Sequence, residues 1–271
     1  MPPSPPTPGA RAVRWLWLLG GSFVAAFTLV SAISGMASAL ARDTDTFRTE
    51  VDQPITSLWV DSDAATSIRI VGTQADVVVV DAVTHRGIIV PDHSEEVVDG
   101  QLRIESRCGG LGPLAVGFFC GVEYTIQVPS DVDVKVSRAN GRVEVENVDG
   151  VIDLQTDGAN IQVTDAGGPV TAHTVGGSFD AVGLSGPSLV VSSAGGGADA
   201  AFTEPPALVQ VRTAGGGSTI LLPPGQEGYA LDTSASGGSE VLDVLSDPSA
   251  ERLIAVSTDG GGITIRYQAD P

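Results

Sequence analysis

A short motif recurs seven times in the second half of the chain, and it constrains the fold more than any other feature. Each copy has alternating aliphatic residues, a hydroxyl residue, a glycine-rich segment and a second aliphatic alternation, as in VKVSRANGRVEV (134–145) and LVQVRTAGGGSTILL (208–222). The hydroxyl residues are spaced 19, 18, 19, 20, 20 and 25 residues apart, and they are Ser137, Thr156, Thr174, Ser193, Thr213, Thr233 and Thr258. A repeat of about twenty residues without helical periodicity predicts stacked supersecondary units.

The repeats predict strands that wind into a coil. Alternation on both sides of each glycine segment turns one face of every strand inward. Glycines such as Gly141 and Gly195 permit the backbone angles of a corner, and the hydroxyl groups can bond local backbone groups and stack between copies. The spacing also fits antiparallel hairpins, because a glycine or proline falls near the middle of each repeat.

The same side-chain order in every copy favours the parallel coil, in which like residues lie above like. We therefore expect an all-β fold, a β-solenoid of the single-stranded parallel β-helix type, with regular repeats over 131–271. Aromatic residues make up only 5% of the chain, and between 131 and 226 they are limited to Phe179 and Phe202. This composition predicts a narrow core of Val, Ile, Leu and Ala.

The N-terminal 41 residues predict a membrane anchor. Residues 1–14 form a proline-rich tail ending in two arginines, and the 27 residues from 15 to 41 carry no charge. A helix needs about 20 apolar residues to cross a bilayer, and the arginines before the run favour a cytoplasmic N-terminus. A cleaved signal is the alternative, since Ala37, Ser38 and Ala39 form a small-residue site, although signal cores are usually only about 7 to 15 residues long. Either reading exports the rest of the chain, and the anchor reading gives a single-pass cell-membrane protein with its C-terminal domain outside the cytoplasm.

Residues 42–130 also read as strands, and we interpret them as irregular first coils and an N-terminal cap. The two cysteines of the chain, Cys108 and Cys120, lie in this segment. An even cysteine count in an exported chain predicts a disulfide between them. The loop between them is strongly apolar. It either folds over the open end of the coil as a cap or forms a contact patch, and its candidate residues are Leu111, Leu114, Phe118 and Phe119.

The charge of the exported part excludes one class of partner. Arg11 and Arg14 precede the uncharged run, so 12 basic residues stand beside 33 acidic ones from Arg42 onward, a net charge of −21. Affinity for nucleic acid depends on Lys and Arg contacts to phosphate, so nucleic-acid binding is not expected. Lys135, Arg138 and Arg142 lie in one repeat and could form a small basic spot, against the simpler interpretation of a solvated strand face.

Several features together resemble a known family. They are the single N-terminal hydrophobic segment, the strand-rich lead-in LWVDSDAATSIRIVG (58–72), the cysteine pair before YTIQVP (124–129), and G-x-V-x-V motifs such as GRVEV (141–145). In these respects residues 55–267 resemble the "β-strand-repeat putative adhesin" family of bacterial envelope proteins, whose function is unknown. The resemblance implies surface display and adhesion, and it supplies no catalytic residues.

The sequence offers no motif for catalysis or for a dedicated metal site. His85, His93 and His173 are isolated in sequence, and no GxSxG or HExxH pattern occurs. The segment GGGADA (195–200) comes nearest to a calcium-binding nonapeptide but does not match it. We therefore expect a non-enzymatic, membrane-tethered scaffold or adhesin-like surface without a cofactor, whose partner is an envelope or cell-surface component. The alternatives are a secreted carbohydrate-active enzyme on a parallel β-helix and a calcium-binding repeat protein.

Overall fold

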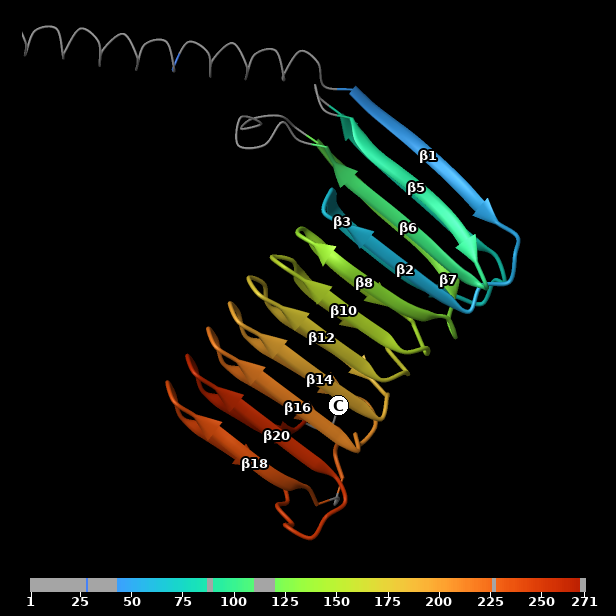
Figure 1. Cartoon of the computed structure of the whole chain (residues 1–271). Helices are drawn as coiled ribbons and strands as arrows, with labels where there is room; N and C mark the ends of the chain where they lie inside the picture. Colours follow the sequence, from blue (N-terminus) through green and yellow to red (C-terminus); the bar gives the residue numbers. More distant parts are fainter. Residues whose placement is uncertain (1–27, 29–42, 87–89, 110–119, 226–227, 269–271) are drawn as a thin grey trace, which may run out of the picture.

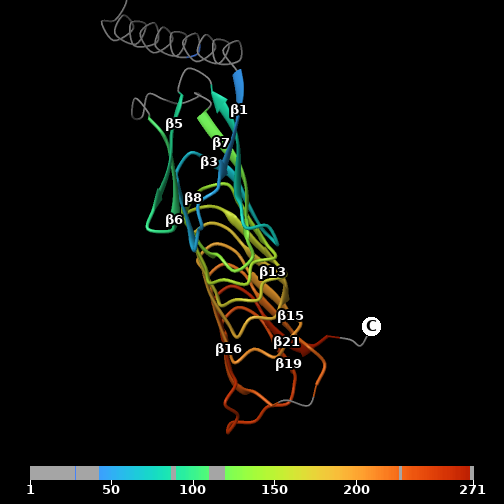
Figure 2. The same ribbon diagram turned by 90° about the vertical axis from the view of Figure 1, so that its right-hand side faces the viewer.

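The computed structural model describes residues 28, 43–86, 90–109, 120–225 and 228–268, and from residue 43 on its regular elements are β strands (Figure 1). The strands form two sheets that face each other across one core (Figure 2). The predicted membrane segment 15–41 lies outside the described residues, except for Thr28. Among the described residues, no helix has the length and apolar character that a membrane crossing requires.

The 11-stranded sheet has its strands in the spatial order β1 (Asp43–Val51), β4 (Val78–Arg86), β7 (Cys120–Pro129), β3 (Ala65–Thr73), β9 (Arg142–Glu146), β11 (Asn160–Thr164), β13 (Phe179–Leu184), β15 (Ala198–Phe202), β17 (Ser218–Leu222), β21 (Ile263–Tyr267) and β19 (Glu240–Asp243). The 10-stranded sheet has the order β5 (Pro91–Val98), β6 (Gln101–Cys108), β2 (Ser57–Ser62), β8 (Asp133–Ala139), β10 (Ile152–Thr156), β12 (Val170–Thr174), β14 (Ser188–Ser193), β16 (Leu208–Thr213), β20 (Leu253–Thr258) and β18 (Ala230–Ala235).

Each repeat contributes one strand to each sheet, so one turn of the coil is a pair such as β10 and β11. Successive turns pair in parallel, with Leu154 beside Ala172 and Ala172 beside Val191 in one sheet. The parallel coil predicted for the repeats is therefore present. Towards the N-terminus the sheets become mixed, because β1, β4 and β5 pair antiparallel with their neighbours.

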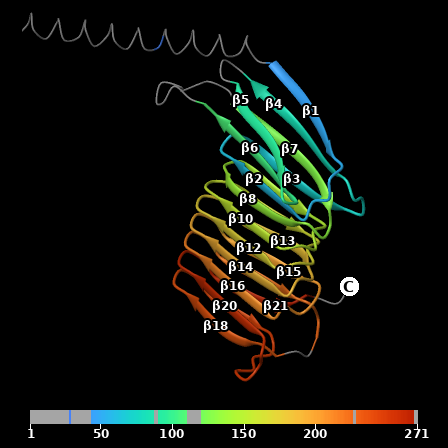
Figure 3. The same ribbon diagram turned by 45° about the vertical axis from the view of Figure 1, so that its right-hand side comes forward.

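The spatial order of the turns departs from the sequence order at the C-terminal end. The last pair, β20–β21, lies between β16–β17 and β18–β19 (Figure 3). Residues of β20 and β21 that face the core, such as Ile254 and Ile263, are fully buried, whereas the β18–β19 turn places Thr233 and Glu240 on that side. Burying an ionised carboxylate between two turns would cost several kcal/mol. The more apolar turn is therefore the inner one.

The outermost turn is closed by polar contacts. Glu240 accepts hydrogen bonds from the Thr233 hydroxyl at 2.8 Å and from the Ala235 backbone N–H at 2.9 Å. An inward-pointing charge on an edge strand opposes further strand addition. At the N-terminal end the order is also changed, because β2–β3 lies between β6–β7 and β8–β9.

The buried hydroxyl groups hold the glycine corners together. The hydroxyls of Ser193 and Thr213 donate to the carbonyl oxygens three residues later, those of Gly196 and Gly216, at 2.9 and 2.5 Å. Thr174 accepts from the Gly177 N–H and donates to the Ala159 carbonyl, both at 3.1 Å. These contacts satisfy corner backbone groups that no strand pairing reaches.

Two of the seven residues predicted to place a hydroxyl group at a corner, Ser137 and Thr233, do not lie there. Arg138 has a φ of 60°, and the register shifts there so that Ala139, not Ser137, lies beside Thr156. Ser137 accepts instead from the Trp59 indole N–H at 3.3 Å. Ala235, rather than Thr233, lies beside Thr258.

At the corners that follow the strands of the 11-stranded sheet, a left-handed backbone conformation recurs from turn to turn. Asn147, Asp165 and Gly183 end three successive turns, and their φ values are 55°, 52° and 76°. Only glycine adopts this left-handed region freely, with Asn and Asp the next most tolerant residues. The sequence thus places a suitable residue at each of these bends.

We predict that Thr174→Val lowers the free energy of unfolding by about 1 to 3 kcal/mol, because the Ala159 carbonyl and the Gly177 N–H would lose their buried partner. Thr171→Val is the matched control, since Thr171 lies on the same strand with its side chain exposed, and it should change stability by less than about 0.5 kcal/mol. Urea unfolding of both variants measures the difference. Equal effects would show that the buried hydroxyls contribute no more than outward ones.

Candidate interaction surfaces

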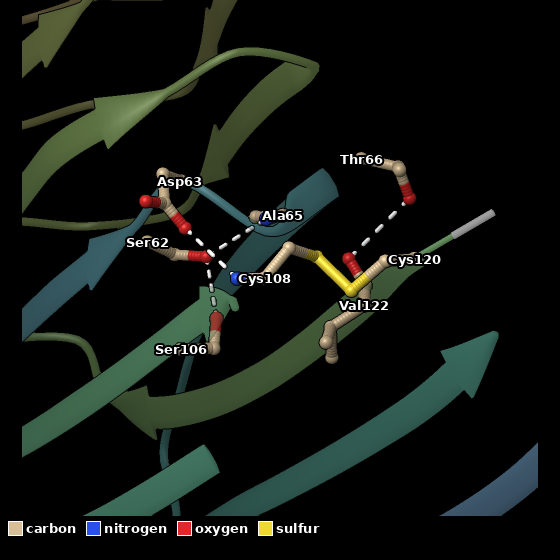
Figure 4. The surroundings of a disulfide bond; sticks show 8 residues. All are labelled: Ser62, Asp63, Ala65, Thr66, Ser106, Cys108, Cys120 and Val122. Carbon is tan, nitrogen blue, oxygen red and sulfur yellow. Dashed lines mark hydrogen bonds between the residues drawn. A yellow bond between two sulfur atoms is a disulfide. The ribbon is translucent and has the colours of Figure 1, made fainter. Parts of the chain in front are cut away.

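The disulfide between Cys108 and Cys120 is present and joins the two sheets. Cys108 ends β6, Cys120 begins β7, and their Cα atoms are 6.1 Å apart (Figure 4). The Asp63 carboxylate accepts from the Cys108 backbone N–H at 3.2 Å, and the Thr66 hydroxyl donates to the Val122 carbonyl at 3.3 Å. The predicted cap or contact residues Leu111, Leu114, Phe118 and Phe119 lie outside the described residues.

A polar network crosses the N-terminal end of the coil. His93, on β5, contacts the Glu95 carboxylate through Nε2 at 2.9 Å and the Tyr124 hydroxyl through Nδ1 at 2.8 Å. In neutral His93 an Nε2–H donates to Glu95, and the Tyr124 hydroxyl donates to Nδ1. Ser62 and Ser106 continue the polar contacts inward at 2.5 Å. His93, although isolated in sequence from the other histidines, is therefore part of a hydrogen-bonded cluster in the fold.

The pKa values in this network describe a structural role. Burial raises the pKa of Tyr124 to about 12, against the effect of the Ser106 hydrogen bond. Burial alone would raise the pKa of Glu95, but hydrogen bonds from His93 and Thr49 and the charge of His93 outweigh it, so the pKa is lowered. The phenol thus keeps its proton at neutral pH and is not activated as a base or nucleophile. Through the hydrogen bond from Thr49, the ionised Glu95 links the edge strand β5 to β1.

The other two histidines lie on the surface. His85 contacts Glu123 at 3.1 Å with both side chains exposed, and His173 is exposed on β12. Among the described residues, no group of three or more His, Cys, Asp or Glu is placed to hold a metal ion.

The cationic residues of the first regular turn do not form a basic spot. Lys135 pairs with Asp153 at 3.0 Å and Arg138 pairs with Asp61, both on the 10-stranded sheet. Arg142 lies on the other sheet and is 3.6 Å from Glu144. Their charges are neutralised by carboxylates.

A hollow with a mainly apolar lining lies on the outer face of the 11-stranded sheet. It has a volume of about 270 Å³ and is lined along three strands by Val182, Ala201 and Leu221. Ala201 lies beside Leu221 in the register, and its small side chain forms the floor. Val182 is 60% exposed, which is high for a large aliphatic residue.

Acidic residues border one side of the hollow. Asp180 and Asp199 lie side by side in the register of β13 and β15 and line the hollow. The Asp199 carboxylate accepts from the Thr219 backbone N–H at 2.8 Å, which fixes its position. The recess therefore combines an aliphatic floor with an anionic rim, a pattern that fits the stem and head of a Lys or Arg side chain.

Local sequence patterns do not predict this hollow. The hollow is lined by outward-facing residues of three neighbouring strands, two from each: Asp180 and Val182, Asp199 and Ala201, Thr219 and Leu221. It forms because the small side chain of Ala201 lies between the larger Val182 and Leu221 on the flanking strands. These residues are far apart in the sequence, so the hollow can be recognised only when the register of the three strands is known.

A second recess, of about 280 Å³, lies on the outer face of the 10-stranded sheet. Its floor is formed by Ala255 and Ser257 of β20, and Gln210, Arg212 and Asp232 flank it. Its lining is mainly polar, as is usual for a solvated strand face.

Comparison with known proteins adds little to this picture. No family model matches the chain. No curated protein matches it either. Among solved structures, a "putative cell adhesion protein" from Clostridium sporogenes ATCC 15579 is similar, with 10% identity and a TM-score of 0.41 over 83% of this chain and 100% of the other. A "putative adhesin" from Bacteroides fragilis NCTC 9343 has 10% identity and a TM-score of 0.39 over 83% of this chain and 97% of its own. Similarity at this level supports no argument about function.

We predict that Glu95 makes stability depend on acid pH. Because its pKa is lowered by folding, the ionised form stabilises the protein above the pKa of the unfolded chain, and this contribution is lost as the pH falls through the lower folded value. The stability difference between wild type and Glu95→Gln should therefore be largest near neutral pH and shrink between about pH 5 and pH 3. Chemical unfolding at several pH values measures it.

Glu96→Gln is the control for this experiment, since Glu96 is the exposed neighbour on β5 and faces outward. A difference for Glu95→Gln that stays constant over the whole pH range would contradict the role given to the network.

Proposed function

We propose that the protein is a non-catalytic, adhesin-like scaffold of the bacterial cell envelope, tethered to the cytoplasmic membrane through residues 15–41 with its solenoid outside the cytoplasm. Its function is to bind a protein partner of the envelope along the outer face of the 11-stranded sheet. The hollow floored by Ala201 is the observation on which this proposal depends.

The regular stacking of the coil suits such a function. Outward residues of successive turns lie in register, as in the row formed by Gln162, Asp180 and Asp199. Neighbouring strands are about 4.8 Å apart, so the row presents side chains at a fixed interval along the rod. An extended partner can contact several turns at once without reordering the surface, which lowers the entropic cost of binding.

The charge of the surface selects the chemistry of the partner. The segment from Arg42 onward carries a net charge of −21, and the rim of the hollow is anionic. A partner segment with Lys or Arg side chains flanked by aliphatic residues is complementary to both the rim and the floor. Electrostatic complementarity of this kind contributes to association rate and specificity.

Two observations support the proposed location. The uncharged run from 15 to 41 has the length of a membrane span, and two arginines precede it. The disulfide between Cys108 and Cys120 is a bond that persists in oxidising compartments and is rare in the cytoplasm.

We predict that a photoactivatable cross-linker at Val182 captures a specific protein in living cells, whereas one at Val190 does not. Val190 is the matched control, because it faces outward from the same region of the rod on the opposite sheet. Ala201→Arg, which fills the floor of the hollow and adds a positive charge, should abolish capture at Val182 while the protein remains folded. Equal capture at both positions, or capture that survives Ala201→Arg, would contradict the proposal.

A further inference from the structure

The strands at the N-terminal end meet at one corner of the rod. In the 11-stranded sheet Asp43 lies beside Arg86, and Arg86 lies beside Cys120. In the 10-stranded sheet Pro91 lies beside Cys108, and the disulfide joins the two sets. Because neighbouring strands are about 4.8 Å apart, these strand ends occupy a compact area. We call it the N-terminal corner, formed by Asp43, Arg86, Val90, Cys108 and Cys120.

The proposed tether places this corner next to the membrane. Only Arg42 separates the uncharged run 15–41 from Asp43, the first residue of β1. One residue of extended chain covers at most about 3.6 Å. If residues 15–41 cross the bilayer as one helix, they span about 40 Å against a hydrocarbon core of about 30 Å, so the start of β1 lies within about 10 Å of the core boundary, in or beside the headgroup layer.

The exposed side chains near the corner are compatible with contact to lipid headgroups. Val90 is 61% exposed and lies just before β5. The nearby charges Asp92 and Arg107 face each other across the β5–β6 pair. Such a pair of opposite charges adds little net charge to the corner.

The other ends of the same strands have the opposite character. Asp52 follows β1, Asp99 lies between β5 and β6, and Asp131 follows β7, and all three are exposed. Bacterial membranes rich in anionic lipid repel such carboxylates over about a Debye length. The corner thus has opposite charges in register, Asp43 with Arg86 and Asp92 with Arg107, whereas the far ends of its strands carry exposed carboxylates.

From these observations we propose that the N-terminal corner rests on the lipid headgroups and that strands β1 and β5 point away from the membrane. This inference rests on the proposed tether and adds an orientation to it. Val98, at the far end of β5, would stand about 26 Å farther from the bilayer than Val90, since a strand rises about 3.3 Å per residue. The headgroup layer is only several ångströms deep, so the two positions experience different surroundings.

The test compares tryptophan at these two positions in the full chain. Val90→Trp and Val98→Trp are each made in a background with Trp15→Phe and Trp17→Phe, and both sites tolerate a large side chain because Val90 and Val98 are 61% and 50% exposed. Trp59 remains in every protein, so its emission and quenching, measured in the background protein without a new tryptophan, are subtracted. The proteins are reconstituted into vesicles of phosphatidylethanolamine and phosphatidylglycerol, with or without bromine on the acyl chains near the headgroup. Bromine quenches tryptophan emission only at contact distance.

We expect quenching of the Val90→Trp emission to exceed that of Val98→Trp by about twofold or more, because only the first position lies within reach of the headgroup layer. Equal quenching of both, or of neither, in protein that stays with the vesicles after an alkaline carbonate wash would overturn the orientation and leave the tether intact. Release of the protein by that wash would instead contradict the tether, and with it the proposed location.

Discussion

Parallel pairing between successive turns is the constraint on which this structure depends. Because each turn bonds to the next through its backbone, a residue that faces the core in one turn has a core-facing residue directly above and below it, as Val191 lies between Ala172 and Val211. Mid-sized aliphatic side chains make up most of this narrow interior, and the buried rings of Phe179 and Phe202 lie beside the smaller Ala198 and Leu184 in the next turn. The corner hydroxyls then satisfy the backbone groups that the pairing leaves free.

The two ends of such a stack are prone to aggregation, because unpaired strand edges can pair with strands of other chains. The two ends use the same device in different forms. At the C-terminal end the Glu240 carboxylate lies on the core side of the outermost turn, β18–β19, and accepts a hydrogen bond from Thr233. At the N-terminal end the edge strand β5 turns His93 and Glu95 inward, where they meet Tyr124. In both cases a charge occupies a position that an aliphatic residue holds in the interior turns. The core thereby ends in polar groups.

The local structure was predictable from the sequence, and the long-range order was not. Alternation and glycine corners predicted strands and a parallel coil, and the even cysteine count of an exported chain predicted the disulfide. The exchange of β18–β19 with β20–β21 escaped prediction, because the repeats resemble one another and no local pattern specifies a neighbour. Ser137 was misplaced because the register shift at Arg138 cannot be seen in the alternation. His93 and Tyr124 are 31 residues apart, and the hollow at Ala201 depends on three strands, so both required the register of the fold.

The order of the turns can be measured directly with engineered disulfides. Arg212 of β16 lies beside Ser257 of β20, and Ser257 lies beside Ser234 of β18, all on the outer face. Neighbouring strands bring Cα atoms to about 4.8 Å, within disulfide range, whereas strands two apart are separated by about 9.6 Å. The account predicts that Arg212→Cys with Ser257→Cys forms a bond under mild oxidation and that Arg212→Cys with Ser234→Cys does not. A bond in the second pair and none in the first would show that the turns stack in sequence order and would contradict the account.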